Sequence, residues 1–301
     1  MNKKRKLVMA FVLIFALALS GIVNAGATDS YTEDAESSYI LPESRAALPA
    51  GAYGTEVNVN GRNVLSGRAF VKDGITYVPM FAFADWLGVF SYSYNNNTGT
   101  AFVNGTALEI SAQAGRLYIC ANGRYFYTDG QVIYHNGTTY VPIHPMVKAL
   151  NSYIRWNSSD GKYYVSSGDT RLLKSGEKFY REDEVYWLSR IISAESRGEP
   201  LKGKIAVGNV VLNRMRSAEY PNTIYGVIFD KRYGIQFSPV ANGTIYKAPT
   251  EESIIAAKIC LEGYTLSDEI LYFLNPSVVS SSWITKNRPY AFTVGNHAFY
   301  K

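Results

Sequence analysis

Glu195 is the residue whose type and position most directly suggest chemistry. An apolar stripe at helical spacing precedes it, formed by Val185, Leu188, Ile191 and Ile192. Glu195 falls on the same face as this stripe, three residues after its last member. Burial on that face would disfavour the charged form and raise the pKa of the carboxyl, which suits a general acid. The alternative is that Glu195 ends the helix in solvent, just before Gly198 and Pro200.

Other catalytic chemistries have weaker support. The chain has three histidines and two cysteines, with no His-Glu-x-x-His or Cys-x-x-Cys spacing, so neither a metal nor another cofactor is expected. Cys260 and His297 are the best alternative for nucleophilic catalysis, but Cys260 lies in an apolar helical run that is typical of a buried, inert thiol. The carboxylates remain as candidate catalytic groups. Glycosidic cleavage normally uses two of them, whereas one acid suffices when the 6-hydroxyl of the sugar itself attacks.

The elements that position Glu195 belong to a mixed α+β domain predicted over residues 183–301. Residues 184–208 are predicted as helix–turn–helix, with a second helix over 204–214. The other predicted elements are a helical turn that ends near Phe229, a loop or hairpin at 237–246, a helix at 251–261 capped by Thr250, and strands at 269–274 and 292–300.

The N-terminus has the features of a secretory signal peptide over residues 1–25. A basic patch at residues 3–6 precedes an apolar run from Leu7 to Leu19, and small residues follow. These four basic residues account for most of the net charge of +5, so the remainder carries about +1 and gives no support for nucleic-acid binding. We expect secretion without stable membrane insertion after cleavage. Retention of the segment as an uncleaved anchor is the alternative. Residues 26–55 are predicted as a linker.

An internal repeat occupies residues 56–168. The segment from Asp73 to Pro79 recurs from Asn136 to Pro142, at a constant offset of 63 residues. Asp-Gly and Asn-Gly pairs are typical of two-residue hairpin turns, and the Tyr-Val-Pro that follows is typical of a strand ended by proline. A short apolar helix comes next in each unit. Gly88 and Asn151 then occupy equivalent positions that favour a left-handed helix cap. Residues 169–182 are predicted as a second linker.

The repeat resembles the stalk-type domain named from the N-terminus of copper amine oxidases. The resemblance rests on the Asp/Asn-Gly-x-x-Tyr-Val-Pro core. It implies a module for presentation or wall association, with no chemistry of its own.

The C-terminal region resembles the cell wall hydrolases of the spore cortex-lytic SleB/CwlJ type. The segments that carry this resemblance run in order through the domain: Ala194–Pro200, Gly203–Val207, Val210–Arg214, Tyr220–Ile224, Gly226–Phe229, Gln236–Gly243, Leu271–Pro276, Trp283–Ile284 and Gly295–Phe299. The chain departs from the family at its front, where a stalk-type repeat replaces the peptidoglycan-binding repeat that such enzymes often carry. This leaves open whether spore cortex or vegetative wall is the substrate.

The family resemblance implies a small lysozyme-like fold that cleaves the glycan strand of peptidoglycan. Its essential acid is the first Glu of the Glu-x-Arg-Gly-Glu motif, which falls on Glu195. Asn213 and Arg214 are further candidates for binding sugar, with a helix C-cap role as the alternative. The predicted substrate-binding residues are Arg197, Glu199, Gln236, Ser238 and Asn242.

The predicted architecture is therefore an α+β chain, with a β-rich two-repeat stalk domain followed by a small lysozyme-like catalytic domain. The predicted activity is cleavage between N-acetylmuramic acid and N-acetylglucosamine, as a lytic transglycosylase or a glycosidase, with peptidoglycan glycan strands as the partner. We expect the protein to be associated with the cell wall, including that of the spore. The alternatives are a non-catalytic wall-binding protein with a degenerate hydrolase domain, and a peptide-cleaving enzyme that uses Cys260.

Overall fold

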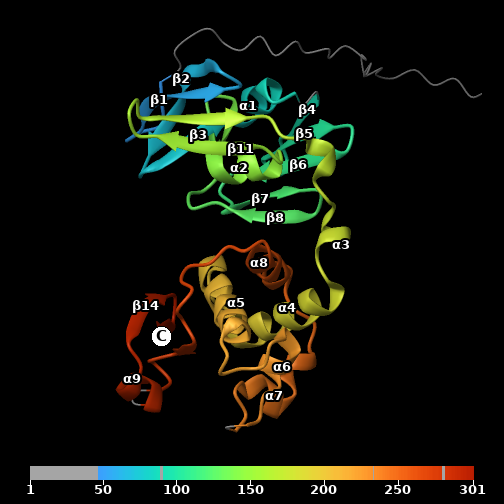
Figure 1. The fold of residues 1–301 in the computed structure, drawn as a ribbon, viewed down its shortest axis with the longest axis vertical. Coiled ribbons are helices and arrows are strands. Elements are labelled where there is room, and N and C mark those ends of the chain that lie inside the picture. The colour runs from blue at the N-terminus through green and yellow to red at the C-terminus, as the bar shows by residue number, and fades with distance from the viewer. Residues whose placement is uncertain (1–46, 89–90, 233, 280–281) are drawn as a thin grey trace, which may run out of the picture. The chain divides into compact units, whose positions relative to one another are not determined.

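A computed structural model describes residues 47–88, 91–232, 234–279 and 282–301 of the chain. The predicted signal peptide and most of the first predicted linker lie outside these residues. Figure 1 shows a β-rich region that leads into a largely helical region, so the predicted order of a β-rich part followed by an α+β part is confirmed.

The β-rich region contains two sheets. The seven-stranded sheet has the order β11-β12-β1-β2-β3-β10-β9, and the five-stranded sheet has the order β4-β5-β6-β7-β8. The strands of the first sheet are β1 (Tyr53–Val59), β2 (Arg62–Lys72), β3 (Ile75–Pro79), β9 (Ile133–His135), β10 (Thr138–Pro142), β11 (Tyr153–Asn157) and β12 (Lys162–Ser166). Those of the second are β4 (Ser91–Asn95), β5 (Thr100–Gly105), β6 (Leu108–Gln113), β7 (Tyr118–Ala121) and β8 (Arg124–Tyr127).

The two sequence repeats meet at the β3–β10 pair of the larger sheet. β3 and β10 pair antiparallel, with Val78 opposite Val141. These two residues are equivalent in the repeat, so the two units are related by a local two-fold axis at this pair. The predicted turn residues Asp73 and Asn136 have φ angles of 52° and 47°, as Asp-Gly and Asn-Gly hairpin turns require.

A short helix follows each repeated hairpin. α1 (Met80–Trp86) and α2 (Ile143–Ala149) each begin directly after the proline of the repeat. Gly88 and Asn151 have φ angles of 86° and 47°, which confirms the left-handed caps that the repeat predicts. The buried faces of both helices join the core that lies under the sheets.

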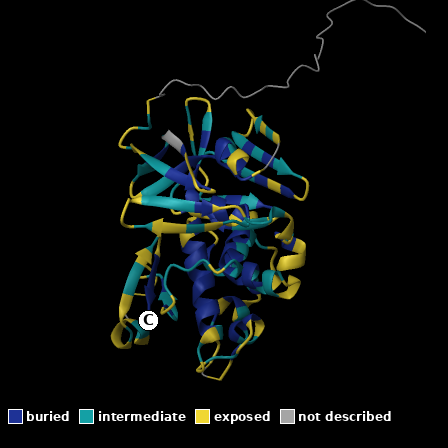
Figure 2. Cartoon of the chain, turned by 45° about the horizontal axis from the view of Figure 1, so that its top comes forward, coloured by how far each residue is buried: buried dark blue, intermediate teal, exposed yellow. Residues whose placement is uncertain are grey.

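The C-terminal region is built around one central helix. α5 (Leu201–Arg216) is buried along nearly all of its first fourteen residues. α4 (Glu182–Ser196) and α8 (Glu251–Leu261) pack against it. A side chain at Gly208 would lie 2.7 Å from the Cys260 sulfur and 2.9 Å from Ile192 Cδ1, so only glycine allows the three helices to approach this closely. Figure 2 shows the buried residues gathered along these helices and the exposed ones at the turns.

Smaller elements complete the C-terminal region. The three-stranded sheet has the order β13-β15-β14. Its strands are β13 (Tyr272–Leu274), β14 (Tyr290–Val294) and β15 (His297–Tyr300). The remaining helices and helical turns are η1 (Thr170–Leu172), α3 (Gly176–Phe179), α6 (Ile224–Ile228), α7 (Ser238–Asn242), η2 (Thr244–Tyr246) and α9 (Trp283–Asn287).

Two of the predicted elements differ from the structure, one in type and one in being divided by a turn. Residues 237–246 form α7 and η2 instead of a loop or hairpin, because Pro239 at the start of α7 favours a helical first turn and Gly243 ends it with a φ of 78°. The predicted strand at 292–300 is a two-stranded hairpin, because Gly295 and Asn296 form a turn between β14 and β15. The predicted helices around Glu195 and the helix capped by Thr250 are confirmed.

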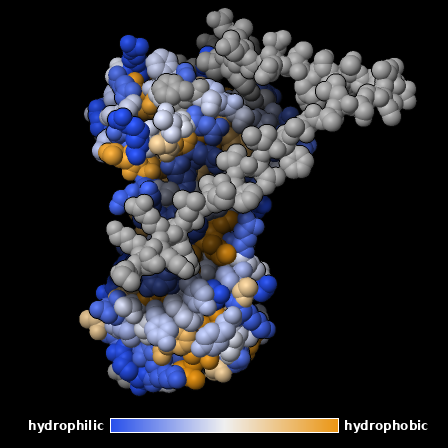
Figure 3. Space-filling model, turned by 90° about the vertical axis from the view of Figure 1, so that its right-hand side faces the viewer, coloured by the Kyte–Doolittle hydropathy of each residue, from blue (hydrophilic) through white to orange (hydrophobic). Residues whose placement is uncertain are grey.

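Residues Ser44–Lys301 make up one compact unit. Within it, the Arg124 guanidinium of β8 donates two hydrogen bonds, of 2.8 and 2.7 Å, to the carboxylate of Glu262, the residue that follows α8. No helix within the described residues is long and apolar enough to span a bilayer. On the face drawn in Figure 3, hydrophilic residues predominate and apolar ones occur in separate patches.

Candidate active site

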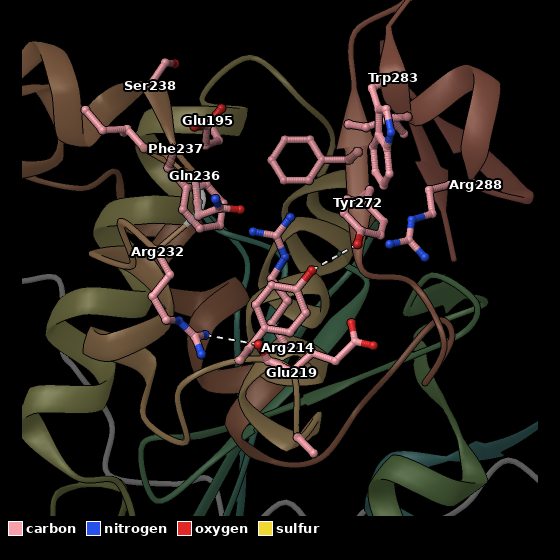
Figure 4. Close-up of a pocket in the computed structure, with 15 residues that line it drawn as sticks. Glu195, Arg214, Glu219, Arg232, Gln236, Phe237, Ser238, Tyr272, Trp283 and Arg288 are labelled. Carbon is pink, nitrogen blue, oxygen red and sulfur yellow. Dashed lines mark hydrogen bonds between the residues drawn. The ribbon is translucent and has the colours of Figure 1, made fainter.

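A cavity of about 1020 Å³ opens beside the C-terminal end of α4. Glu195 and Arg214 line it together with segments from the α5–α6 connection, the start of α7, β13 and α9 (Figure 4). The other described lining residues are Ala218, Glu219, Tyr220, Arg232, Ile235, Gln236, Phe237, Ser238, Tyr272, Phe273, Trp283, Ile284 and Arg288.

Glu195 lies in the last turn of α4, and its side chain reaches the cavity. The apolar residues that precede it on this helix, Leu188, Ile191 and Ile192, are fully buried and hold that face against the core. Within the part of the chain that the structure describes, no side chain or backbone group forms a hydrogen bond or an ion pair with the Glu195 carboxyl. Burial without a charged partner raises the pKa of Glu195 to about 7.

The opposite wall of the cavity is aromatic and cationic. The Tyr220 hydroxyl donates a hydrogen bond of 3.2 Å to the Tyr272 hydroxyl. The Arg288 guanidinium lies 4.7 Å from the ring centroid of Tyr272 and 4.9 Å from that of Trp283. Trp283 is 58% exposed and lines the cavity, so its side chain is accessible to a ligand. Figure 4 shows this group across the cavity from Glu195.

The structure brings two of the predicted substrate-binding residues to the same cavity as Glu195. Gln236 and Ser238 lie next to Phe237 on the wall that Glu195 occupies (Figure 4). The Gln236 amide donates a hydrogen bond of 3.0 Å to the Gly234 carbonyl, which fixes its orientation. Ser238 is exposed at the first residue of α7. Both side chains offer hydrogen-bonding groups to a polar ligand.

Two other predicted residues do not reach the cavity. Arg197 is the exposed C-cap residue of α4 and is absent from the described lining. Asn242 is also exposed, and its side-chain oxygen accepts hydrogen bonds of 3.0 and 2.7 Å from the backbone and hydroxyl of Thr244. Asn242 thus caps the turn after α7 and is turned back onto its own backbone.

Glu199 is buried at a different place from Glu195. Its carboxylate accepts a hydrogen bond of 2.9 Å from the backbone N–H of Asn296 and another of 2.9 Å from the Asn296 side chain. A side chain at Gly295 would lie 1.9 Å from the same carboxylate, so the turn between β14 and β15 closes directly over Glu199. Burial alone would raise the pKa of Glu199, but the two hydrogen bonds outweigh it and hold the pKa below its usual value.

Sequence reasoning missed most of the opposite wall. Tyr272 and Trp283 lie in segments that carry the family resemblance and Arg288 lies outside them, and the spacing of the three residues in the sequence gives no sign that they converge. The sequence left the roles of Asn213 and Arg214 open between sugar binding and helix capping, and the structure gives the two residues different positions. Asn213 donates to the carbonyls of Ser267 and Ile270 and holds the loop before β13, whereas Arg214 lines the cavity.

Cys260 and His297, the alternative residues for nucleophilic catalysis, lie away from the cavity. Cys260 is 1% exposed, and burial raises the pKa of its thiol far above the usual value. His297 packs against the rings of Phe273 and Phe299, and burial lowers its pKa. Neither residue lines the cavity among the residues described. Nor do those residues include a cluster of three or more His, Cys, Asp or Glu side chains that could hold a metal ion.

Comparison with known families identifies both regions of the chain. Residues 198–300 match the family described as Cell Wall Hydrolase, and residues 58–165 match the Copper amine oxidase N-terminal domain. The chain therefore carries a cell wall hydrolase domain preceded by a copper amine oxidase N-terminal-like domain, as the sequence motifs predict.

Individual relatives match part of the chain. The spore cortex-lytic enzyme of Bacillus cereus is 38% identical over 122 residues, which are 40% of this chain and 46% of that enzyme. The spore cortex-lytic enzyme of Bacillus subtilis is 36% identical over 120 residues, which are 40% of this chain and 38% of that enzyme. The chain thus spans less than half the length of these relatives.

A solved structure is similar to part of the chain. The catalytic domain of the germination-specific lytic transglycosylase SleB from Bacillus anthracis is 38% identical, and the match covers 40% of this chain and 97% of that one, with a TM-score of 0.37.

Proposed function

We propose that residues 183–301 cleave the glycan strand of peptidoglycan between N-acetylmuramic acid and N-acetylglucosamine, with Glu195 as general acid and then base. The observation that carries this proposal is the Glu195 carboxyl, which is unpartnered among the described residues, lies in a cavity of about 1020 Å³ and has a pKa of about 7. A carboxyl with this pKa is largely protonated below neutral pH and can give up its proton near it. The family match and the names of the relatives support the substrate class.

The reaction requires two proton transfers at one carboxyl. Glu195 donates its proton to the bridging oxygen as the bond from C1 of the muramoyl sugar to that oxygen breaks. The departing sugar leaves with a free 4-hydroxyl. The Glu195 carboxylate then removes the proton from the 6-hydroxyl of the muramoyl sugar, and that oxygen bonds to C1. The product is a 1,6-anhydro sugar, no water is consumed, and Glu195 ends protonated.

The arrangement of carboxyls favours this transglycosylase route over hydrolysis. A hydrolase needs a second carboxylate across the scissile bond. Glu199, four residues from the acid, does not line the cavity and is fully occupied by Asn296. The other described carboxylate of the lining is Glu219, which Figure 4 shows well apart from Glu195, at the other end of the cavity lining. A reaction that uses the 6-hydroxyl of the sugar needs only Glu195.

Mass spectrometry of soluble fragments released from spore cortex and from vegetative peptidoglycan tests the proposal. We expect anhydro-muropeptides from the wild type, and a rate about 10²–10⁴-fold lower from Glu195→Gln, since general acid–base catalysis contributes about this much. Glu219→Gln is the matched control, because it neutralises the other described carboxyl of the same cavity and should act within a few-fold of the wild type. Full activity of Glu195→Gln would refute the assignment, and reducing ends would replace the transglycosylase by a hydrolase.

The rival function is a wall-binding protein with a degenerate hydrolase domain. In that case the wild type would pellet with wall sacculi and release no fragments from either wall. For the whole chain we propose secretion and association with the cell wall, with the spore cortex as the first substrate to test, because the relatives are named for cortex lysis. We further propose that residues 56–168 serve to hold or space the catalytic domain at the wall.

A further inference from the structure

Arg214 is the most deeply buried cation of the cavity wall. It lies in the last turn of α5, is only 6% exposed, and stands between the Gln236 side of the cavity and the Tyr272 side (Figure 4). Its Nε donates a hydrogen bond of 2.8 Å to the Leu271 carbonyl. Three rings surround the guanidinium at 5.1–5.4 Å, those of Tyr220, Phe237 and Tyr272.

This guanidinium has donors that the described protein does not use. Its Nη1 is buried and has no hydrogen-bond partner, and no carboxylate pairs with it within the described residues. Arg232, which lines the same cavity, differs because its Nη2 lies 2.9 Å from the Asp230 carboxylate. A buried charge without an anion is costly, and three aromatic rings offset only part of that cost. Nη1 is thus a donor without an acceptor among the described residues, on a side chain that lines the cavity.

Arg288, a second cation that lines the cavity, also has a buried donor without a hydrogen-bond partner. The donor is the Nε of Arg288. Its guanidinium lies 4.7 Å from the Tyr272 ring, and that of Arg214 lies 5.4 Å from the same ring. Tyr272 is thus flanked by two cations, neither of which has a carboxylate partner among the residues described. This wall favours a ligand that brings acidic or carbonyl oxygens of its own.

Arg214 does not account for the raised pKa of Glu195. A cation close to Glu195 would lower the pKa of that carboxyl, but burial alone accounts for the direction of its shift. Removal of Arg214 should change ligand binding without changing the protonation of Glu195.

We propose that Arg214 is a specificity-determining residue that binds an acyl oxygen on the 3-O-lactyl side chain of the muramoyl sugar. This inference rests on the proposed function. Both sugars of the strand carry an acetamido group, so only the lactyl group distinguishes them. It presents a carboxylate when free and a carbonyl when joined to peptide, and the planar guanidinium fork matches either. With the lactyl group at Arg214, the muramoyl sugar is placed within the cavity that Glu195 lines.

Calorimetric titration of the full chain carrying Glu195→Gln tests this inference without consuming the ligand. The first probe is a peptide-free tetrasaccharide of alternating N-acetylglucosamine and N-acetylmuramic acid, and the second is tetra-N-acetylchitotetraose, which lacks the lactyl group. We expect the muramoyl ligand to bind about ten-fold or more tightly than the chitin ligand, because hydrogen bonds to a charged group are worth about this factor. Adding Arg214→Gln should bring the two affinities within about two-fold.

The ratio of the two affinities is the readout, because partial unfolding of a variant weakens both ligands equally. Arg214→Lys keeps the charge but loses the fork, so its ratio should be intermediate. Arg216→Gln is the matched control, since Arg216 is an exposed residue of the same helix turn that does not line the cavity. A third ligand, whose lactyl carboxyl is converted to an amide, shows whether Arg214 recognises a carboxylate or a carbonyl. A preference for the free acid alone identifies a carboxylate, and a preference for both forms identifies a carbonyl.

The inference would be overturned if Arg214→Gln left the ratio of the two ligand affinities unchanged. It would also be overturned if the variant weakened the binding of both ligands equally, or if neither ligand bound. The proposed function is judged separately, by the fragments that wild type and Glu195→Gln release. If the enzyme cleaves the wall but Arg214→Gln leaves the ratio of the two ligand affinities unchanged, only the specificity role of Arg214 is refuted. A protein that prefers the muramoyl ligand through Arg214 but never cleaves would refute only the catalytic one.

Discussion

Glu195 and Glu199 are four residues apart in one motif, yet the structure gives them opposite environments. Glu195 ends α4 in the cavity, with no described partner and a raised pKa. Glu199 begins the connection to α5, receives two hydrogen bonds from Asn296 and has a lowered pKa. Burial raises the pKa of Glu195 because nothing opposes it, whereas at Glu199 the hydrogen bonds from Asn296 outweigh the effect of burial.

This contrast teaches how one motif serves two purposes. A carboxylate with its lone pairs occupied stabilises the fold and is a poor proton donor. A carboxyl without partners makes the fold less stable when it is charged, but it can transfer a proton near neutral pH. We infer that Glu199 holds the turn between β14 and β15 in place, while Glu195 is left available for the substrate.

The pH dependence of activity gives the largest expected effect. If Glu195 must be protonated to act, kcat/KM should fall about ten-fold for each pH unit above about 7, a loss of about 100-fold at pH 9. Initial rates of fragment release between pH 5 and pH 9 would measure this, with thermal melting at each pH as the control for folding. A rate that is flat to pH 9 would mean that the free enzyme carries no acid of this pKa.

Glu199 should show its effect in stability. Glu199→Ala removes both acceptors of the hydrogen bonds from Asn296 to the buried Glu199 carboxylate, so we expect the free energy of unfolding to fall by about 2–4 kcal/mol. Because the pKa of Glu199 is lowered in the fold, its contribution should be complete above about pH 4.3 and lost as pH falls through its folded pKa. Denaturant titration at pH 3 and pH 7 measures both effects.

Asn296→Ala serves as the matched partner in a double-mutant cycle with Glu199→Ala. The side-chain part of the pair should give a coupling energy of about 1–3 kcal/mol. Additive losses would show that the two residues act independently, and the holding role of Glu199 would be withdrawn.

Substitution of Glu195 should change the free energy of unfolding in the opposite direction from substitution of Glu199, and by a smaller amount. Its pKa is raised in the fold, so the charged form weakens the native state as pH rises from about 4.5 to about 7. Glu195→Gln removes that charge and should raise the free energy of unfolding by about 1–3 kcal/mol at pH 8, with little change at pH 4. Denaturant titrations at the two pH values decide it. A variant less stable than the wild type at pH 8 would contradict the environment that we describe for Glu195.

Much of the fold could be predicted because its signals are local. The Asp-Gly and Asn-Gly turns of the repeat need positive φ, and the structure has it at Asp73 and Asn136. The helix capped by Thr250 begins and ends as its residues predict. The hairpin at Gly295 was missed although a Gly-Asn pair stands in the middle of the segment, because the apolar residues on both sides suggested one continuous strand.

The sequence by itself determined the repeat, the helix–turn–helix that carries Glu195 and the apolar stripe that places this residue on a buried face, because these depend on periodicity and turn chemistry within a few residues. Only the tertiary structure decided which polar residues share the cavity. It placed Gln236, Ser238, Arg214 and Trp283 around it and turned Glu199 and Asn242 to other partners. Such choices depend on contacts between segments up to about a hundred residues apart, as between Glu199 and Asn296, and no local pattern records them.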